Sequence, residues 1–548
     1  MTELKIAICQ TSPYVGNFDK NYEIIKKSYE YATENNCDIA VFAEGTIHGY
    51  YAFDLFQSKH FIDACMEKIN DIAELTKNNK TAIIIGSATK SDTELPLNSA
   101  IVMIDGKVVH MTHKRRLANE SACIDSRQFD TGFPKKPFTI NGVKISMPIC
   151  HDIWNEQNCS DIIKDSDLVI SINASPYYYG KLSKRHNVVK SLATKLKIPF
   201  IYMHDAGAYD GVLNEGGSFA YNSDGNLAMQ LPQFKTKNII INYNNGILSS
   251  DENKYIYEDE DNFCPTIWEA CCFGLKQYVD KNGFNGVVLG LSGGIDSAIT
   301  ATIAVDALGA KNVHTVMMPS RYTSKDSLDD ANALIKNLGI SNEIIGIEPM
   351  INAFEESFKK VMRGTQVDNT EENIQARIRG AIIMSISNKF GYLALTTGNK
   401  SENAVGYATL YGDMCGGFNI IKDIYKTDVF KLCKWRNKDK AIIPQNIISK
   451  TPTAELRENQ TDQDNLPEYE ILDTILKCFI EKRMSIKQTI QLGFHKDTVE
   501  KIWKLLHIAE YKRKQSAVGL KLTSCDFDYD RLYPISNDFI WHELKKDK

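Results

Sequence analysis

A strand-like segment that leads through a glycine-rich loop into a helix-like segment constrains the fold of this chain more than any other feature. The aliphatic run Val287–Leu289 precedes the loop, and apolar residues continue in a helical pattern to Leu308. The loop itself reads Gly290-Leu291-Ser292-Gly293-Gly294-Ile295-Asp296-Ser297. Its glycines let backbone N–H groups approach phosphate oxygens, its serines add hydroxyl donors, and the helix N-terminus adds partial positive charge. The carboxylate of Asp296 would repel a phosphate unless Mg²⁺ lay between them, so the segment predicts a Mg²⁺–nucleotide loop.

The residues after this loop continue to alternate between strand and helix patterns. Predicted strands lie at Val313–Met318, Glu343–Ile347 and Leu393–Thr396. Predicted helices lie at Ser297–Leu308, Asp326–Leu338 and Glu372–Ser387, and the last hundred or so residues read as mostly helical. This alternation is typical of an α/β domain with a doubly wound, Rossmann-like parallel sheet. A ligand-free glycine turn remains the alternative for the loop.

The first half is richer in strands and predicts a layered α/β domain. Asn21–Thr33 predicts an amphipathic helix, and strands are expected at Lys5–Ile8, Ile39–Phe42, Ala82–Ile85, Ala100–Ile104, Val143–Met147, Leu168–Ile172 and Phe200–Met203. The stretch Asp251–Asn262 is rich in charge and poor in aliphatic residues. We therefore expect domains at residues 1–245 and 264–548 with a linker at 246–263. A solvated loop inside one domain is the alternative for the charged stretch.

Composition excludes several classes of protein. The formal net charge is −5, from 64 basic and 69 acidic residues, which gives no electrostatic reason to expect nucleic acid as a partner. No apolar run is long enough for a membrane span, and the first residues lack the pattern of a signal peptide. Thirteen scattered cysteines without metal-binding spacing suggest reduced thiols, so we expect a cytoplasmic protein that binds neither nucleic acid nor membranes.

Three residues of the first half combine into a possible amide-hydrolysing site. Glu44, Lys114 and Cys150 each follow a strand-like run, where side chains from different strands converge. A cysteine attacks an amide as the thiolate, a carboxylate takes the proton and returns it to the leaving ammonia, and an ammonium group stabilises the oxyanion. Each of the three residues taken alone is more often structural.

The segments around these residues resemble the glutaminase branch of the nitrilase superfamily, whose site is a Glu–Lys–Cys triad. The matching segments are Cys150-His151-Asp152-Ile153-Trp154, Asn173-Ala174-Ser175-Pro176-Tyr177 and Gly216-Gly217-Ser218-Phe219. The resemblance implies an α-β-β-α sandwich and glutamine-binding positions at Glu120, Ser175 and Lys181. Three departures from the pattern of this branch affect how glutamine would be bound. His151 replaces a usual Glu, Glu120 stands where a Tyr commonly contacts the substrate, and His204-Asp205 replace Asn-Gln.

The second half resembles enzymes with an ATP pyrophosphatase loop and, in longer motifs, NAD synthetases. These motifs are Glu372–Arg379, Thr396–Glu402, Gly406–Asp413, Lys422–Thr427 and Tyr511–Arg513. The resemblance implies ATP contacts from the loop Gly290–Ser297 and from Thr397, and Mg²⁺ ligands at Asp296 and Glu402. It also implies positions for deamido-NAD (nicotinate adenine dinucleotide) at Asn373, Arg377, Glu402, Asp413, Lys426 and Lys512.

The two resemblances combine into one reaction. Glutamine hydrolysis would release ammonia, and ATP would activate the carboxylate of deamido-NAD, giving NAD, AMP, pyrophosphate and glutamate. The resemblance also implies a homo-oligomer, with a dimer of the second domains as the minimum and an octamer as an option. Alternatives are a different ATP-dependent amidotransferase, an RNA-modifying ATP pyrophosphatase and a non-catalytic binding protein. The acidic charge balance argues against the second alternative, and the complete triad argues against the third.

Overall fold

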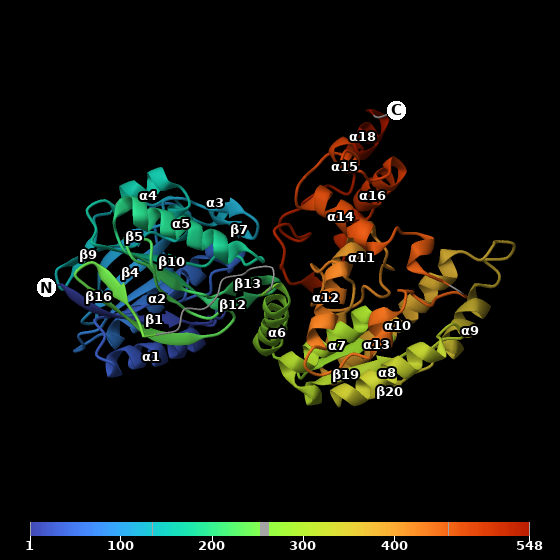
Figure 1. The fold of residues 1–548 in the computed structure, drawn as a ribbon. Coiled ribbons are helices and arrows are strands. Elements are labelled where there is room, and N and C mark those ends of the chain that lie inside the picture. Colours follow the sequence, from blue (N-terminus) through green and yellow to red (C-terminus); the bar gives the residue numbers. More distant parts are fainter. Residues whose placement is uncertain (1, 134, 252–261, 459, 547–548) are drawn as a thin grey trace. The chain divides into compact units, whose positions relative to one another are not determined.

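The computed structural model describes residues 2–133, 135–251, 262–458 and 460–546 (Figure 1). Contacts divide the chain into two compact units, Met1–Glu260 and Asp261–Lys548. Residues 252–261 of the expected linker lie outside the described residues. Before them, Ile247–Ser249 form strand β17 of the first unit, and helix α6, Phe263–Asn282, opens the second unit.

The first unit contains two mixed β-sheets. The seven-stranded sheet has the order β17, β16 (Lys237–Asn244), β1 (Glu3–Gln10), β2 (Ile39–Val41), β3 (Ala82–Thr89), β4 (Leu97–Ile104) and β5 (Lys107–His113). The six-stranded sheet has the order β15 (Leu227–Gln230), β14 (Phe219–Tyr221), β11 (Phe200–His204), β10 (Leu168–Asn173), β9 (Val143–Ser146) and β8 (Phe138–Ile140). Each strand expected from the sequence of this half falls on one of these strands.

Side-chain alternation along the strands shows how the layers pack. On β1, Ile6 and Ile8 belong to a core shared by both sheets, whereas Ala7 and Cys9 belong to a core formed with helices. Those helices are α1 (Phe18–Glu34) and α2 (Lys59–Leu75); helices α4 (Glu156–Ile163) and α5 (Lys181–Leu196) cover the other sheet. Because both faces of the central strands β2, β3, β10 and β11 are buried, these strands read as nearly continuous apolar runs. The arrangement is the α-β-β-α sandwich expected from the sequence.

The second unit is built on a parallel sheet. Its order is β20 (Ser341–Ile344), β19 (Val313–Met317), β18 (Val287–Gly290), β21 (Leu393–Thr396), β22 (Phe418–Asn419) and β23 (Val518–Gly519). Numbered along the chain, this is the 3-2-1-4-5-6 order of a doubly wound sheet, which confirms the predicted fold class. The helices that follow the first strands are α7 (Ile295–Leu308), α8 (Lys325–Leu338), α9 (Glu348–Phe358) and α10 (Asn369–Phe390).

Two expected elements of this unit differ from the structure. The strand expected at Glu343–Ile347 begins earlier, at Ser341, because an edge strand pairs on one side only and tolerates polar residues there. The C-terminal part is helical in α12 (Lys426–Arg436), α14 (Tyr469–Ile480), α16 (Lys496–Ile508) and α17 (Glu510–Arg513). The chain then returns to the sheet as β23, which is only two residues long and was not predicted from the sequence.

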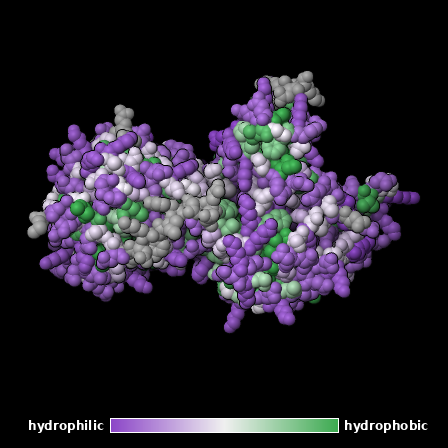
Figure 2. All heavy atoms as spheres, in the orientation of Figure 1, coloured by the Kyte–Doolittle hydropathy of each residue, from purple (hydrophilic) through white to green (hydrophobic). Residues whose placement is uncertain are grey.

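The exposed faces of both units are largely hydrophilic in the view of Figure 2. Among the described residues, no helix combines the length and apolar character needed to cross a membrane.

Candidate functional site

Glu44 lies just beyond the end of β2 and is almost completely buried. Its Oε1 accepts hydrogen bonds from Asn98 and Lys114, each at 2.8 Å, and its Oε2 accepts one from the N–H of Ala174 at 2.8 Å. Burial raises its pKa, an effect that Lys114 partly offsets. A methyl group at Gly86 would come within 2.6 Å of the Glu44 Cα, so β3 must carry glycine for the two backbones to lie this close. Glu44 is thus a rigidly held base of raised basicity.

Lys114 follows β5 and lies between two carboxylates. Its Nζ is 2.8 Å from Glu44 Oε1 and 2.8 Å from Asp125 Oδ2, and all three side chains are fully buried. Asp125 also accepts bonds from the Tyr50 hydroxyl at 2.6 Å and from the N–H of Ala118 at 2.9 Å. Burial opposes a charge on Lys114, but Asp125 and Glu44 raise its pKa well above the ordinary value. The ammonium group is therefore permanent at neutral pH.

Cys150 begins the short 3-10 helix η2, Cys150–Ile153, and has a φ of +45°. This left-handed conformation is unusual for a cysteine and is typical of a side chain held in place for function. Burial and then Glu44 raise the pKa of the thiol, whereas Lys114 lowers it. The resting thiol is thus neutral and needs a base to become a nucleophile.

Asp152 joins the Cys150 loop to the Lys114 loop. Its Oδ1 accepts the backbone N–H groups of Arg115 at 3.0 Å and Arg116 at 2.8 Å, while its Oδ2 accepts the N–H of Ile149 at 3.0 Å. The backbone segments next to Cys150 and Lys114 are therefore held by one carboxylate. Together with Glu44, these two residues form an arrangement able to hydrolyse an amide through a thioester.

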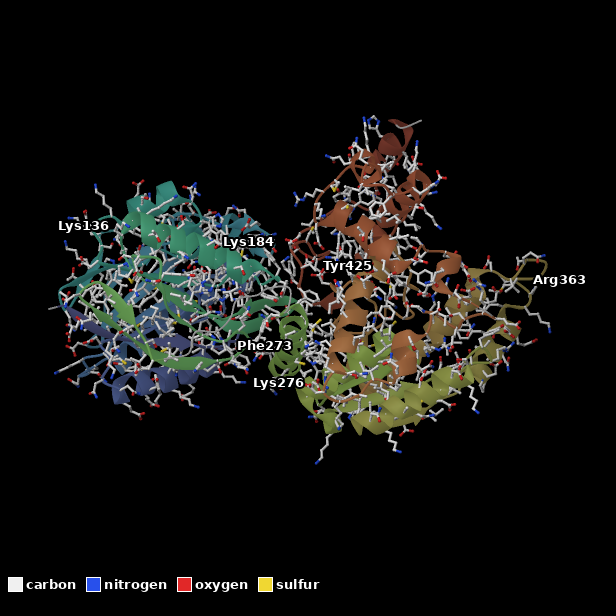
Figure 3. All side chains as sticks on the ribbon, viewed as in Figure 1. Lys136, Lys184, Phe273, Lys276, Arg363 and Tyr425 are labelled. Atoms are coloured by element: carbon white, nitrogen blue, oxygen red, sulfur yellow. The ribbon has the colours of Figure 1, made fainter. Side chains whose placement is uncertain are left out.

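The expected glutamine-binding residues lie around this triad. Ser175 follows β10, and Lys181 begins α5, the helix on which Figure 3 labels Lys184. Lys181 is 8% exposed, and burial followed by repulsion from Arg185 lowers its pKa to about 8. Glu120 is exposed on β6, Asn119–Glu120, and pairs with Cys123 of β7, Cys123–Ile124.

The other departures from the nitrilase pattern lie on η2 and at the end of β11. His151 is partly buried on η2, where burial lowers its pKa and Glu120 opposes that shift. His204 ends β11 and is fully buried. Asp205 is also buried and accepts a hydrogen bond from Asn214 at 2.7 Å. The triad and these side chains thus form one group in the first unit.

In the second unit, the predicted phosphate loop joins β18 to α7. Gly293 has a φ of +79°, and a methyl group there would overlap the carbonyl oxygen of Ser327. Ser292 and Ser297 hold the loop through a contact of 3.1 Å between their hydroxyl groups, and Ser292 Oγ accepts the N–H of Gly294 at 3.2 Å. The loop has the strand–loop–helix geometry expected of a phosphate site.

Lys426 connects the two carboxylates predicted to bind a cation. Its Nζ donates to Asp296 Oδ2 and, at 3.1 Å, to Glu402 Oε1. Asn399 donates to Asp296 Oδ1 at 2.9 Å. Burial raises the pKa of Glu402 to about 8, with Lys426 lowering it and Asp296 raising it further. Tyr425, the buried residue before Lys426, is labelled within this unit in Figure 3.

A cavity of about 320 Å³ opens onto these groups. Asp296, Thr397, Glu402, Asp413 and Lys426 line it, together with Gly290, Leu291, Ser292, Gly294, Ile295 and Ser297 of the loop. The cavity therefore brings the predicted ATP residues other than Gly293 together with three of the residues predicted to bind the dinucleotide.

The remaining residues predicted to bind the dinucleotide contact the segment Gly406–Asp413. Asn373 Oδ1 accepts the Thr409 hydroxyl at 2.7 Å, and Arg377 Nε donates to the carbonyl of Leu410 at 3.3 Å. Lys512 Nζ donates to the carbonyls of Gly406 at 2.8 Å and Ala408 at 2.6 Å. These three residues hold the segment Gly406–Asp413 in shape, and its last residue, Asp413, lines the cavity.

Comparison with known proteins matches both halves. Residues 5–244 match the carbon-nitrogen hydrolase family, and residues 267–516 match the NAD synthase family. The chain is 38% identical over 543 residues to the glutamine-dependent NAD(+) synthetase of Acinetobacter baylyi, covering 98% of this chain and 99% of that protein. It is 40% identical to the protein of the same name from Rhodobacter capsulatus, covering 97% of this chain and 98% of that one.

The chain belongs to the glutamine-dependent NAD(+) synthetases. A solved structure of this family, from Acinetobacter baumannii in complex with ADP, is 36% identical and superimposes with a TM-score of 0.78 over 98% of this chain and 99% of that one. A second, from Cytophaga hutchinsonii, is 21% identical with a TM-score of 0.84 and supports the fold, covering 99% of each chain. Membership also disfavours the alternative of an RNA-modifying pyrophosphatase.

The sequence did not single out several acidic residues of these sites. Asp125 and Asp152 hold the Lys114 and Cys150 loops, as described above. Asp462 lines the synthetase cavity, accepts the Tyr469 hydroxyl at 2.7 Å and raises the pKa of Lys426 together with the other carboxylates. Each lies in a loop or at a short helix, where a lone Asp resembles a solvated turn residue.

Proposed function

We propose that this chain makes NAD from deamido-NAD, ATP and glutamine, with glutamine hydrolysis at Cys150 and amidation at the Gly290–Ser297 loop. The observation that carries the proposal is the presence of two complete sites in one chain. The first is the buried Glu44–Lys114 pair near Cys150; the second is the cavity on which Asp296, Glu402 and Lys426 converge.

In the proposed glutaminase step, Glu44 removes the proton from the Cys150 thiol as the sulfur attacks the side-chain carboxamide of glutamine. Lys114 stabilises the oxyanion of the tetrahedral intermediate through its ammonium group. Glu44 then returns the proton to the departing nitrogen, and ammonia leaves. Water, with Glu44 again as base, hydrolyses the thioester to glutamate and restores the thiol.

In the proposed synthetase step, the carboxylate of deamido-NAD attacks the α-phosphate of ATP and displaces pyrophosphate. The acyl adenylate has AMP as its leaving group, which ammonia displaces to form the carboxamide. Backbone N–H groups of the loop and the Lys426 ammonium group hold negative phosphates. Asp413 has its pKa raised to about 6 by burial and lies on the cavity wall, where it can take a proton from the attacking nitrogen.

Asp296 and Glu402 fit a divalent cation that is bound together with ATP. Oxygen ligands suit Mg²⁺. Burial raises the pKa of Glu402, Lys426 lowers it and Asp296 raises it, so a bound cation would favour the ionised form of this carboxyl. Within the described part of the chain, no group of three or more His, Cys, Asp or Glu side chains has metal-binding geometry, so phosphate oxygens and water would complete the coordination. When bound, Mg²⁺ would neutralise phosphate charge and orient the α-phosphate.

Further assignments follow the family resemblance. We propose that residues 1–245 form the glutaminase domain and 264–548 the synthetase domain, and that Glu120, Ser175 and Lys181 bind glutamine. We also propose that Thr397 contacts ATP and that Asn373, Arg377 and Lys512 shape the dinucleotide site. The protein is proposed to be cytoplasmic and homo-oligomeric, a dimer at least, without nucleic-acid or membrane partners.

The test supplies Mg·ATP and deamido-NAD together with either glutamine or ammonium, and measures NAD. The wild-type protein should use both nitrogen donors. Cys150→Ala should abolish only the glutamine-driven reaction, whereas Asp296→Ala should abolish both. Loss of the ammonium-driven reaction in Cys150→Ala would contradict two separate sites.

A further inference from the structure

The segment after β10 is held by side chains from three other elements. The N–H of Ala174 donates to Glu44 Oε2 at 2.8 Å, and the N–H of Ser175 donates to His204 Nε2 at 3.0 Å. Arg185 Nη2 donates to the carbonyl of Ser175 at 3.0 Å and to its hydroxyl oxygen at 2.7 Å. Both backbone N–H groups are therefore occupied, so neither is available to an oxyanion, and the Ser175 hydroxyl is the group that remains.

The orientation of that hydroxyl follows from its contacts. A serine hydroxyl has one hydrogen to donate and two lone pairs. Since Arg185 donates to the oxygen, the hydrogen of Ser175 must point away from the guanidinium group. The Tyr202 hydroxyl also lies within hydrogen-bonding reach of the Ser175 side chain. The single Ser175 hydrogen can therefore be donated to Tyr202 or, when substrate is bound, to one of its carboxylate or carbonyl oxygens.

Arg185 is held in place on its other side by an ion pair with Glu215, the last residue of β13, Val212–Glu215. Both side chains are completely buried, and Arg185 is among the largest fully buried side chains of the described residues. A buried ion pair contributes little net stability, and fixing geometry is a recognised role for such pairs. Among the described residues, Ser175 is the only one whose side-chain hydroxyl accepts a hydrogen bond from Arg185.

His204 supplies the acceptor for the Ser175 N–H. Burial and then Arg185 lower the pKa of His204 well below the ordinary value, so the ring stays neutral. Nε2 lies 3.0 Å from the Ser175 nitrogen and 3.2 Å from the Ser175 carbonyl oxygen. When Nε2 accepts the N–H, it carries no hydrogen and the ring proton lies on Nδ1. His204 stands where the resemblance to the nitrilase branch implies Asn, which also offers an acceptor through its side-chain oxygen.

We propose that Arg185, held by Glu215, and His204 are positioning residues that aim the Ser175 hydroxyl at glutamine and thereby set the affinity for this substrate. The inference rests on the proposed glutaminase function. None of these residues takes part in bond making. Their loss should therefore raise KM for glutamine and leave kcat and the ammonium-driven reaction unchanged.

The test measures both reactions for Arg185→Lys, Ser175→Ala and the double variant. Each single variant should raise KM for glutamine by about 10-fold, the usual effect of losing one hydrogen bond to a charged group, with kcat within about two-fold. Because Arg185 acts through the Ser175 hydroxyl, the double variant should be no worse than Ser175→Ala. Lys190→Ala, on the exposed side of the same helix, is the matched control.

Two results would overturn the proposal. One is an unchanged KM for glutamine in Arg185→Lys, and the other is an additive effect in the double variant. If Arg185→Lys does not fold, as seen from its melting curve and lost ammonium-driven activity, His204 decides the question. His204→Leu should raise KM while His204→Asn should not, and equal values would refute the role. A wild-type protein that makes no NAD from glutamine would instead refute the proposed function.

Discussion

Gly293→Ala is expected to disable ATP use while leaving glutamine hydrolysis intact. Gly293 has a φ of +79°, and a left-handed conformation costs a residue with a Cβ roughly 1–2 kcal/mol. The new methyl group would also overlap the carbonyl oxygen of Ser327 on α8. Non-bonded heavy atoms rest about 3.5 Å apart, so the loop and α8 must separate by on the order of 1 Å. A misplacement of about 1 Å costs on the order of 100-fold in rate.

The experiment compares Gly293→Ala with Gly339→Ala. Gly339 caps the C-terminus of the same helix α8 with a φ of +66°, and a methyl group there meets no atom within 4 Å. Both variants therefore carry backbone strain, but only Gly293→Ala moves the loop. We expect kcat/KM for ATP in the ammonium-driven reaction to fall about 100-fold in Gly293→Ala and less than about three-fold in Gly339→Ala. Equal kinetics in the two variants would refute a phosphate role for this loop.

Three further predictions concern the glutaminase site. Asp125→Asn should lower kcat of the glutamine-driven reaction by at least about 10-fold, because Lys114 loses one of its two carboxylates. The ammonium-driven reaction is the control, and an unchanged kcat with glutamine would contradict a role of Asp125 in holding Lys114. Gly86→Ala should displace Glu44 and abolish glutamine use while sparing ammonium use; retained glutaminase activity would show that the backbone tolerates the methyl group. Because the pKa of Lys181 is lowered to about 8, its charge is lost as the pH rises through that value, so KM for glutamine should rise above pH 8. Lys181→Arg stays charged and should therefore show a KM that changes little with pH. The same rise of KM in Lys181→Arg would show that titration of Lys181 is not its cause.

The sequence predicted the helices, strands and loops that depend on residues close to one another along the chain. The aliphatic run before Gly290, the S-G-G-x-D-S loop and the following helix depend on neighbouring residues, and the structure has all three in place. The strand that carries Glu44 toward the site was equally visible, because a buried strand is apolar on both faces.

The residues that hold the site residues in place could not be predicted from the sequence in the same way. Asp125 lies 11 positions after Lys114, and no periodicity links it to the ammonium group that it contacts. Arg185 shares a helix with Lys181, yet its partner Glu215 comes from a distant strand. Asp462 reaches the cavity from the short 3-10 helix η5, Asp462–Asp464. Such contacts arise from tertiary packing, which sequence spacing does not encode.

The most direct test of the account follows the nitrogen atom. The purified protein is supplied with Mg·ATP, deamido-NAD and glutamine labelled with nitrogen-15 in its side-chain amide, and the NAD is analysed by mass spectrometry. The account predicts that the label enters the carboxamide of NAD, with glutamate and AMP formed alongside. Absence of labelled NAD, while glutamine and ATP are both consumed, would contradict it.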